Sequence, residues 1–406
     1  MAAARPAAAP STAANPSGLP LALYIHIPWC VRKCPYCDFN SHASDDPAGT
    51  IPEETYVEAL LADLESALPL VWGRKAGSVF IGGGTPSLLS ADALDRLLAG
   101  VRMRLPLIAD AEITLEANPG TFEADKFRGF RAAGVNRLSL GIQSFDPQQL
   151  KALGRIHDGE QARAAAALAG TLFANFNLDL MYGLPGQTVA QALADVDTAL
   201  SFGPTHLSCY QLTLEPNTPF FAAPPELPAD DTCADMQDAI EARLAAAGFG
   251  HYETSAFARP GQRCRHNLNY WQFGDYLGIG AGAHGKLTLH DRILRQMRHK
   301  SPRAYLDAAR SYAQSGVAKD FLQVNEEVPA DALPFEFMMN ALRLLDGVPT
   351  PLFAERCRLD AKTLNATFAI VEQARREGWM VDDPTRLAPT ERGRRFLNPL
   401  LQRFLT

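Results

Sequence analysis

The sequence lacks three features that would assign it to common classes of protein. It has no paired cysteine framework, because four of its seven cysteines (Cys209, Cys233, Cys264 and Cys357) occur singly. Such usage excludes a disulfide scaffold and indicates a reducing, cytoplasmic environment. It has no excess of positive charge, and a net charge of −7 argues against a nucleic-acid-binding protein. It also has no run of 18 apolar residues, so we expect no transmembrane segment.

The first 19 residues have little sequence complexity. They are rich in alanine and proline, and Arg5 is their single charged side chain, so we expect a disordered tail over 1–19. The rest of the 406-residue chain is long enough for a large domain and a smaller one. A change of character near residue 325 places the two domains at 20–325 and 326–406.

Three cysteines lie within eight residues, as Cys30-x3-Cys34-x2-Cys37. Most [4Fe–4S] clusters take four cysteines, so a loop that offers three thiolates leaves one iron free to bind a small molecule. The alternative is a structural zinc site with His26 or His42 as the fourth ligand. Zinc loops usually combine two short ligand pairs, and the sequence contains no second cysteine pair. The spacing therefore favours the cluster.

Six short apolar runs recur between residues 21 and 214. The segments between them have helical periodicity, at about 53–68, 90–104, 121–133, 159–173 and 188–202, and a sixth such segment follows the last run, at 231–247. Strands that alternate with helices predict an α/β fold with a parallel sheet. We expect a partial (β/α)6 barrel, with an open doubly wound sheet as the alternative. The six runs are Leu21–Ile27, Ser78–Ile81, Glu112–Glu116, Arg137–Ile142, Asn177–Met181 and His206–Leu214.

Unusual residues follow or end these runs, where the active site of a β/α barrel would lie. A Gly-Gly-Gly turn at 82–84 allows close approach of the backbone to a ligand. Glu116 and Asp179 can hold an ammonium group or ribose hydroxyls, or they can be helix caps or surface charges. Gln143 can bind a hydroxyl or carboxylate, and Arg155 can pair with a carboxylate.

The segment 280–285, Gly-Ala-Gly-Ala-His-Gly, formally matches the dinucleotide motif G-x-G-x-x-G. It follows no βαβ start and has no acidic residue about twenty positions later, which argues against a nucleotide-binding role. We expect it to form a loop that closes one side of the ligand cavity.

Taken in order, these motifs resemble the coproporphyrinogen III oxidase-like group of radical S-adenosylmethionine (SAM) proteins. The resemblance covers about residues 20–400, and it includes Tyr24, the cysteine loop and the segments 82–87, 115–119, 141–145, 153–155 and 179–185. It implies that Cys30, Cys34 and Cys37 hold a [4Fe–4S] cluster whose open iron chelates SAM. It further implies that the SAM cavity is lined by Tyr24, Tyr36, Gly83, Gly84, Thr85, Glu116, Gln143, Arg155 and Asp179.

The group has two branches with different activities. The oxygen-independent coproporphyrinogen III dehydrogenases have a longer N-terminal extension and a further cysteine two residues after the third ligand, where this chain has Phe39. The other branch is a heme chaperone marked by H-N-x-x-Y-W, present here at 266–271. The resemblance therefore implies a chaperone that binds heme and delivers it to respiratory proteins. The dehydrogenase remains the alternative.

His266 is the candidate heme ligand because imidazole is a common axial ligand of heme iron. Arg263 and Arg265 are candidates to meet the propionates. A hydrogen-bonded structural histidine is the alternative. The sequence leaves open whether the protein forms a homodimer and whether it contacts a membrane surface.

The C-terminal segment contains periodic stretches at 333–345 and 361–377, a hairpin pattern at 378–389, and a helix start at Thr390. This order resembles a winged-helix domain, so we expect a mostly helical, winged-helix-like unit. Arg392, Arg394 and Arg395 are interpreted as surface charges rather than DNA contacts. The unit would cover the barrel or dock a partner.

Overall fold

A computed structural model describes residues 18–44, 46, 50–121 and 124–405. The predicted disordered tail lies outside the described residues except for its last two positions. Twelve strands form one sheet in the order β14-β13-β12-β11-β1-β4-β5-β6-β7-β8-β10-β9. No helix of the described segments is long and apolar enough to cross a membrane.

The middle of the sheet is parallel and confirms the predicted strand–helix repeat. Its six strands are neighbours both along the chain and in the sheet, so the strand order does not reverse as it would in the doubly wound alternative. The sheet does not close on itself, which agrees with a partial barrel. These strands are β1 (Leu21–Ile27), β4 (Ala76–Gly83), β5 (Leu107–Ala117), β6 (Arg137–Gln143), β7 (Phe176–Tyr182) and β8 (His206–Gln211).

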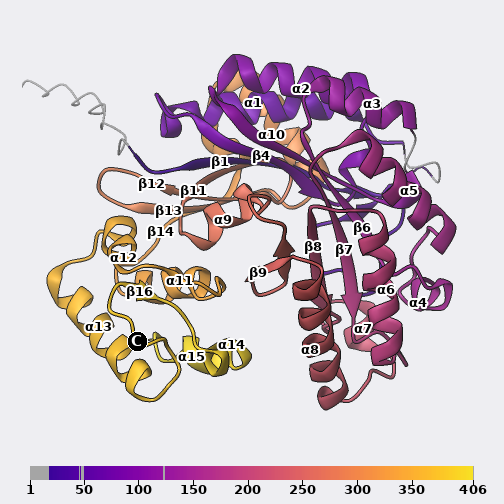
Figure 1. Ribbon diagram of the computed structural model, residues 1–406. Coiled ribbons are helices and arrows are strands. Elements are labelled where there is room, and N and C mark those ends of the chain that lie inside the picture. The colour runs from indigo at the N-terminus through magenta and orange to yellow at the C-terminus, as the bar shows by residue number, and fades with distance from the viewer. Residues whose placement is uncertain (1–17, 45, 47–49, 122–123, 406) are drawn as a thin grey trace, which may run out of the picture.

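Helices cover the outer face of this sheet. Figure 1 shows α1, α2 and α10 packed above β1 and β4. Local signals fix several helix ends, because Ser90 caps α2 and capping boxes begin α5 and α6. The short helix α7 (Pro219–Ala222) instead lies beside the cysteine loop, where the Phe220 amide donates to Pro35. The other helices of this part are α1 (Glu53–Val71), α2 (Ala91–Arg104), α3 (Ala124–Ala133), α4 (Pro147–Ala152), α5 (Gly159–Leu172), α6 (Val189–Ser201), α8 (Asp230–Ala246) and α10 (Pro302–Ser315).

The inner face of the sheet is polar because side chains alternate along each strand. On β6, Leu138, Leu140 and Ile142 belong to the main hydrophobic core, whereas Arg137 and Ser139 alternate with them. The short helix α9 (Arg265–Trp271) contacts β4, β11 and β1. It lies on the side of the sheet opposite α1 and α2 (Figure 1). The concave face is therefore partly filled by α9.

The strands at the two edges of the sheet are not predicted from the sequence. The strand β11 pairs in parallel with β1, and β12 to β14 follow as an antiparallel meander. These edge strands are β9 (Gly250–Glu253), β10 (Ala256–Ala258), β11 (Asp275–Ile279), β12 (His284–Thr288), β13 (Ile293–Arg298) and β14 (Leu322–Glu327). A separate pair, β2 (Trp29–Cys30) and β3 (His42–Ala43), brackets the cysteine loop.

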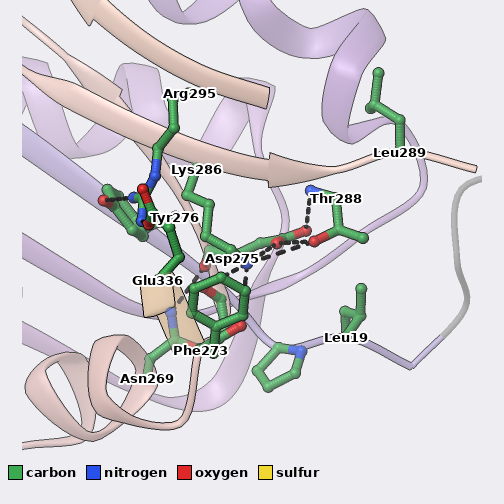
Figure 2. A network of polar contacts seen from close by, with 12 residues as sticks. Leu19, Asn269, Phe273, Asp275, Tyr276, Lys286, Thr288, Leu289, Arg295 and Glu336 are labelled. Carbon is green, nitrogen blue, oxygen red and sulfur yellow. Dashed lines mark hydrogen bonds and ion pairs between the residues drawn. The ribbon is translucent and has the colours of Figure 1, made fainter. Parts of the chain in front are cut away.

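A buried ionic network fixes β11 against β12. Asp275 is fully buried and accepts hydrogen bonds from Lys286 at 3.0 Å, from Arg74 at 2.7 Å, and from the backbone and hydroxyl of Thr288. Figure 2 shows Lys286 and Thr288 converging on Asp275. Burial alone would raise the pKa of Asp275, but Lys286 and Arg74 outweigh it and the pKa is lowered. This network positions Tyr276, which follows Asp275 on β11, and His284, which begins β12.

The C-terminal part contains the predicted helices and hairpin contact, together with an unpredicted helix, α12. Met380 and Pro389 form an antiparallel bridge, and Thr390 caps α14. On α14, Arg394 and Arg395 bond to Glu241 and Asp238 of α8. The elements are α11 (Leu333–Ala341), β15 (Val348–Pro349), α12 (Thr350–Cys357), α13 (Ala361–Arg376), β16 (Arg386–Leu387), α14 (Glu391–Arg395) and α15 (Leu397–Gln402).

Candidate functional site

The cysteine loop lies between β1 and β3, at the carboxyl end of the parallel sheet. All seven cysteines are described and free, and Cys30, Cys34 and Cys37 are partly exposed whereas the other four are buried. Burial raises the pKa of Cys30, a hydrogen bond with Thr85 opposes this, and Cys37 and Cys34 raise it further. The sulfurs of Cys34 and Cys37 are therefore close enough to that of Cys30 to act on it electrostatically.

Within the described segments, no three histidine, cysteine or acidic side chains converge as the ligands of a single metal ion do. A cubane cluster does not require such convergence, because each thiolate binds a different iron. Three thiols on one partly exposed loop, with one cluster iron left without a protein ligand, fit a [4Fe–4S] group of the radical SAM type.

Arg155 joins the cysteine loop to the end of β6. Its guanidinium lies 3.5 Å from the sulfur of Cys34 and 3.4 Å from the hydroxyl of Tyr36, and it donates to the carbonyl of Gly141 at 2.8 Å. Gln143 stands at the same strand end with a left-handed φ of 69°. A Cβ on Gly141 would lie 3.0 Å from the Gln143 amide nitrogen. The structure thus brings Tyr36, Gln143 and Arg155 together beside the cysteines.

The glycine turn after β4 packs against the cysteine loop. Gly83 has a φ of +115°, and a Cβ there would lie 2.6 Å from the His26 ring. A Cβ on Gly84 would lie 2.5 Å from the carbonyl oxygen of Trp29. The protein's own packing therefore requires these glycines, and the turn leaves the amide of Gly83 to donate to Glu116 at 3.1 Å.

His26 connects β1 to the end of the cysteine loop. Its Nε2 lies 2.8 Å from the carbonyl oxygen of Asn40, which can only accept, so Nδ1 accepts from the Tyr24 hydroxyl at 2.9 Å. Burial lowers the pKa of His26 to about 4, which keeps the ring neutral. Both ring nitrogens are engaged, so His26 is not free to serve as the fourth ligand of a zinc site.

A cavity of about 350 Å³ opens beside this loop. Of the residues expected to bind SAM, Tyr24, Gly83 and Glu116 line it. Gly282 and His284 also line it, as expected of a segment 280–285 that closes one side of the cavity. The remaining lining residues, which the sequence analysis did not propose for a ligand cavity, are His26, Phe39, Asn40, Tyr270 and Tyr276.

The floor of the cavity can accommodate positive charge. Burial, with the nearby carboxyl of Asp179, raises the pKa of Glu116 to about 8, while the Gly83 amide and Arg137 oppose the rise. Burial also raises the pKa of Asp179, against hydrogen bonds that include one from Asn177 at 2.7 Å. A ligand with an ammonium or sulfonium group would stabilise both carboxylates. These two carboxylates suit SAM, which carries both an ammonium and a sulfonium group.

Asp179 does not line the cavity, and neither do Gly84 and Thr85. Asp179 lies deeper on the inner face, bonded to Asn177 and Ser139. The backbone amide of Thr85 donates to Trp29 at 2.7 Å. Their contacts with SAM therefore stay predictions, as do those of the cavity residues.

The surroundings of His266 do not support the expectation that it is a heme ligand. The residue is 1% exposed, and its ring nitrogens lie 3.1 Å from Ser78 Oγ and 3.1 Å from the Tyr270 hydroxyl. Its ring stacks on Phe80 with centroids 4.9 Å apart, and burial lowers its pKa to about 3. The structure favours the alternative, a hydrogen-bonded structural histidine.

The two neighbouring arginines are also occupied. Arg263 pairs with Asp346 at 3.3 Å, and Arg265 pairs with Asp110 at 2.8 Å. Neither arginine lines the cavity.

Comparisons with known proteins place the chain in a family. Residues 24–199 match the Radical SAM superfamily, and residues 328–396 match the HemN C-terminal domain. The chain is 50% identical to the heme chaperone HemW of Escherichia coli strain K12, over 95% of this chain and 98% of that protein. It is 46% identical, over the same shares, to the protein of that name from Haemophilus influenzae.

The fold also matches a solved structure. The coproporphyrinogen III oxidase HemN of Escherichia coli, described as a radical SAM enzyme, aligns with a TM-score of 0.79 over 97% of this chain and 92% of that one. The sequence identity is 24%, so the likeness concerns the fold alone.

Proposed function

The chain belongs to the family of the heme chaperone HemW within the radical SAM superfamily, and we propose that it binds heme and passes it to heme-requiring respiratory enzymes. The observation that carries this proposal is the 50% identity to the Escherichia coli chaperone over nearly the whole of both chains. We place the activity in the cytoplasm, where free thiols and an oxygen-sensitive cluster persist.

In this proposal Cys30, Cys34 and Cys37 hold a [4Fe–4S] cluster. Bound there, the cluster would supply the electron that cleaves SAM in radical SAM proteins. Arg155 holds the middle of the loop, at Cys34, against β6. His26 holds the end of the loop, at Asn40, against β1. These two anchors keep the three thiols beside the cavity.

SAM would occupy the cavity between this loop and the sheet. Glu116 and Asp179 supply negative charge for its ammonium and sulfonium groups, and Tyr24 forms part of the wall. Glu116 must release its proton to act as a carboxylate at neutral pH, because its pKa is about 8 without a ligand. Ligand binding would therefore be coupled to proton release.

The alternative, a coproporphyrinogen dehydrogenase, has less support. The position two residues after Cys37 is occupied by Phe39, a cavity residue that is 63% exposed and has no thiol to offer. The fold likeness to the oxidase does not distinguish the two activities, because chaperone and enzyme share the fold.

The test is anaerobic purification of the full chain, with iron, sulfide and heme quantified and with coproporphyrinogen III decarboxylation assayed alongside. We expect stoichiometric heme binding and no decarboxylation with an intact cluster, SAM and a reductant. Transfer is tested by mixing the heme-loaded chain with an apo respiratory cytochrome and following recovery of the cytochrome spectrum. Decarboxylation above background would restore the dehydrogenase.

A further inference from the structure

The residues that line the cavity differ in their exposure to solvent. Most lining residues are buried or half-buried, but Phe39 and His284 are exposed. Tyr24, Tyr270 and Tyr276, which are half-buried, add three aromatic rings to the lining. A flat aromatic ligand can lie across such an opening, with one face against rings and its other face in solvent.

His284 has a ring that is free to coordinate a metal. Within the described residues its imidazole makes no hydrogen bond, although it lines the cavity. Burial, Lys300 and Arg295 lower its pKa, so the ring is neutral at physiological pH and can donate an electron pair.

The other eight histidines of the chain, all described, do not share these properties. Four have both ring nitrogens in hydrogen bonds, namely His26, His157, His206 and His266. The remaining four, His42, His251, His290 and His299, do not line the cavity.

The tyrosine hydroxyls of the cavity are already hydrogen-bonded to other side chains. The hydroxyl of Tyr24 bonds to His26, that of Tyr270 to His266, and that of Tyr276 accepts from Arg295 at 2.6 Å. Burial raises the pKa of all three phenols, which disfavours the phenolate form that iron binds.

Resting on the proposed heme-binding function, the geometry points to His284 as the axial ligand of the heme iron, with the macrocycle lying across the cavity mouth against Phe39. The exposed Lys300 and the half-buried Arg295 stand near His284, where a cation could pair with a propionate of the bound heme. Arg295 is already paired with Glu336, so Lys300 is the cation available to a propionate.

The structure also explains how His284 is held at this place. It begins β12, whose later residues Lys286 and Thr288 are bound to Asp275 in the buried network. Its backbone carbonyl lies against Gly278, where a Cβ would be 2.0 Å away. A ligand on a rigid strand presents its imidazole in one direction.

The test is a hemin titration of the full chain and of His284→Ala, followed by absorption spectroscopy in the Soret region. We expect the variant to bind hemin at least about tenfold more weakly, because even indirect support of a metal ligand contributes that much. Its Soret band should shift, and added imidazole should restore the wild-type spectrum. His290→Ala, which changes an exposed histidine outside the cavity, is the matched control and should titrate as wild type.

An unchanged affinity and spectrum in His284→Ala would overturn the assignment, while heme binding by the wild type would leave the chaperone function standing. A wild-type chain that takes up no hemin would instead overturn the proposed function itself. His266→Gln keeps a hydrogen-bonding side chain at that site, and we expect it to retain the wild-type Soret position. A shift in this variant, with His284→Ala unchanged, would reassign the iron to His266.

Discussion

The Tyr24 hydroxyl and the His26 ring, two residues apart on β1, are hydrogen-bonded at 2.9 Å. The other ring nitrogen of His26 donates to the carbonyl of Asn40 at 2.8 Å, three residues after Cys37. The cavity wall and the end of the cysteine loop are therefore connected through one neutral imidazole. A ligand that moves the Tyr24 ring would therefore also disturb the hydrogen bonds that hold the end of the loop.

This connection predicts that His26→Phe retains the fold but holds its cluster less firmly. The substitution keeps an aromatic ring beside Gly83 and removes both hydrogen bonds. Iron loss to a chelator, followed at the cluster absorption, should be faster than in the wild type. Tyr24→Phe removes only one of the two bonds and leaves the Asn40 anchor, so its rate should lie between the two. Equal rates in all three proteins would contradict the role of His26.

The cysteine assignment gives a direct prediction. Replacing Cys30, Cys34 or Cys37 by alanine should abolish the reconstituted visible absorption of the cluster and any SAM cleavage, because each thiolate would hold a separate iron. Cys233→Ala is a suitable control, since this thiol is buried away from the loop. If a loop variant kept a full complement of iron and sulfide, the cluster would have other ligands.

Much of the parallel sheet could be predicted because its strands are short apolar runs that end at glycine or polar residues. The boundaries of β1 match the predicted run Leu21–Ile27 at both ends. The strands β12 and β13 were missed because they bury polar residues, including Lys286, Gln296 and Arg298, that interrupt the apolar pattern. Their charges find partners only in the folded state, as Arg298 does with Asp63 on α1.

In the candidate site, too, the features that depend on tertiary packing could not be predicted from the sequence. Residues within a continuous motif, such as the cysteines and the glycine turn, could be identified from spacing. His266 is a candidate heme ligand from its motif, with a structural histidine as the alternative, and its burial against Phe80 and Ser78 depends on packing between distant segments. His284 belongs to the loop that was predicted to close the cavity, yet only the tertiary structure shows its ring to be unbonded. Tyr276 lies on β11, which pairs with β1 across about 250 residues of sequence.

The raised pKa of Glu116 predicts that SAM binding strengthens as pH rises toward about 8. Below that pH the protein must release a proton from Glu116 to bind the cationic ligand, so affinity falls by up to about tenfold per pH unit. The other groups that act electrostatically with Glu116 are Asp179, Arg137, Tyr24 and Tyr210.

Isothermal titration in two buffers of different ionisation enthalpy should detect this proton release. Glu116→Gln should bind SAM more weakly at pH 8 by about 1.5–3 kcal/mol, the range for a hydrogen bond to a charged group. The pH dependence of its affinity should be flatter. If Glu116→Gln kept the wild-type affinity but lost much of its stability, Glu116 would be a structural residue.

The buried network around Asp275 predicts a large and specific loss of stability in Asp275→Asn. The substitution leaves Lys286, which is 1% exposed, and Arg74 without a compensating negative charge. Breaking a buried pair in this way costs about 3–5 kcal/mol. Glu54→Gln, which removes the exposed pair with Arg96, is the matched control and should change the free energy of unfolding by less than about 1 kcal/mol.

Denaturant unfolding measured across pH distinguishes an ionic role of Asp275 from a purely steric one. Its pKa is lowered in the folded chain, so the stabilisation is present above the unfolded value of about 3.9 and is lost as pH falls through the folded value. The difference between wild type and Asp275→Asn should therefore be constant at neutral pH and shrink in acid.

The Asp275 network also predicts an effect on hemin binding, because β11 carries Tyr276 and β12 carries His284. Under conditions where Asp275→Asn stays folded, a looser β12 should weaken hemin binding without shifting the Soret band, whereas loss of the ligand in His284→Ala changes both.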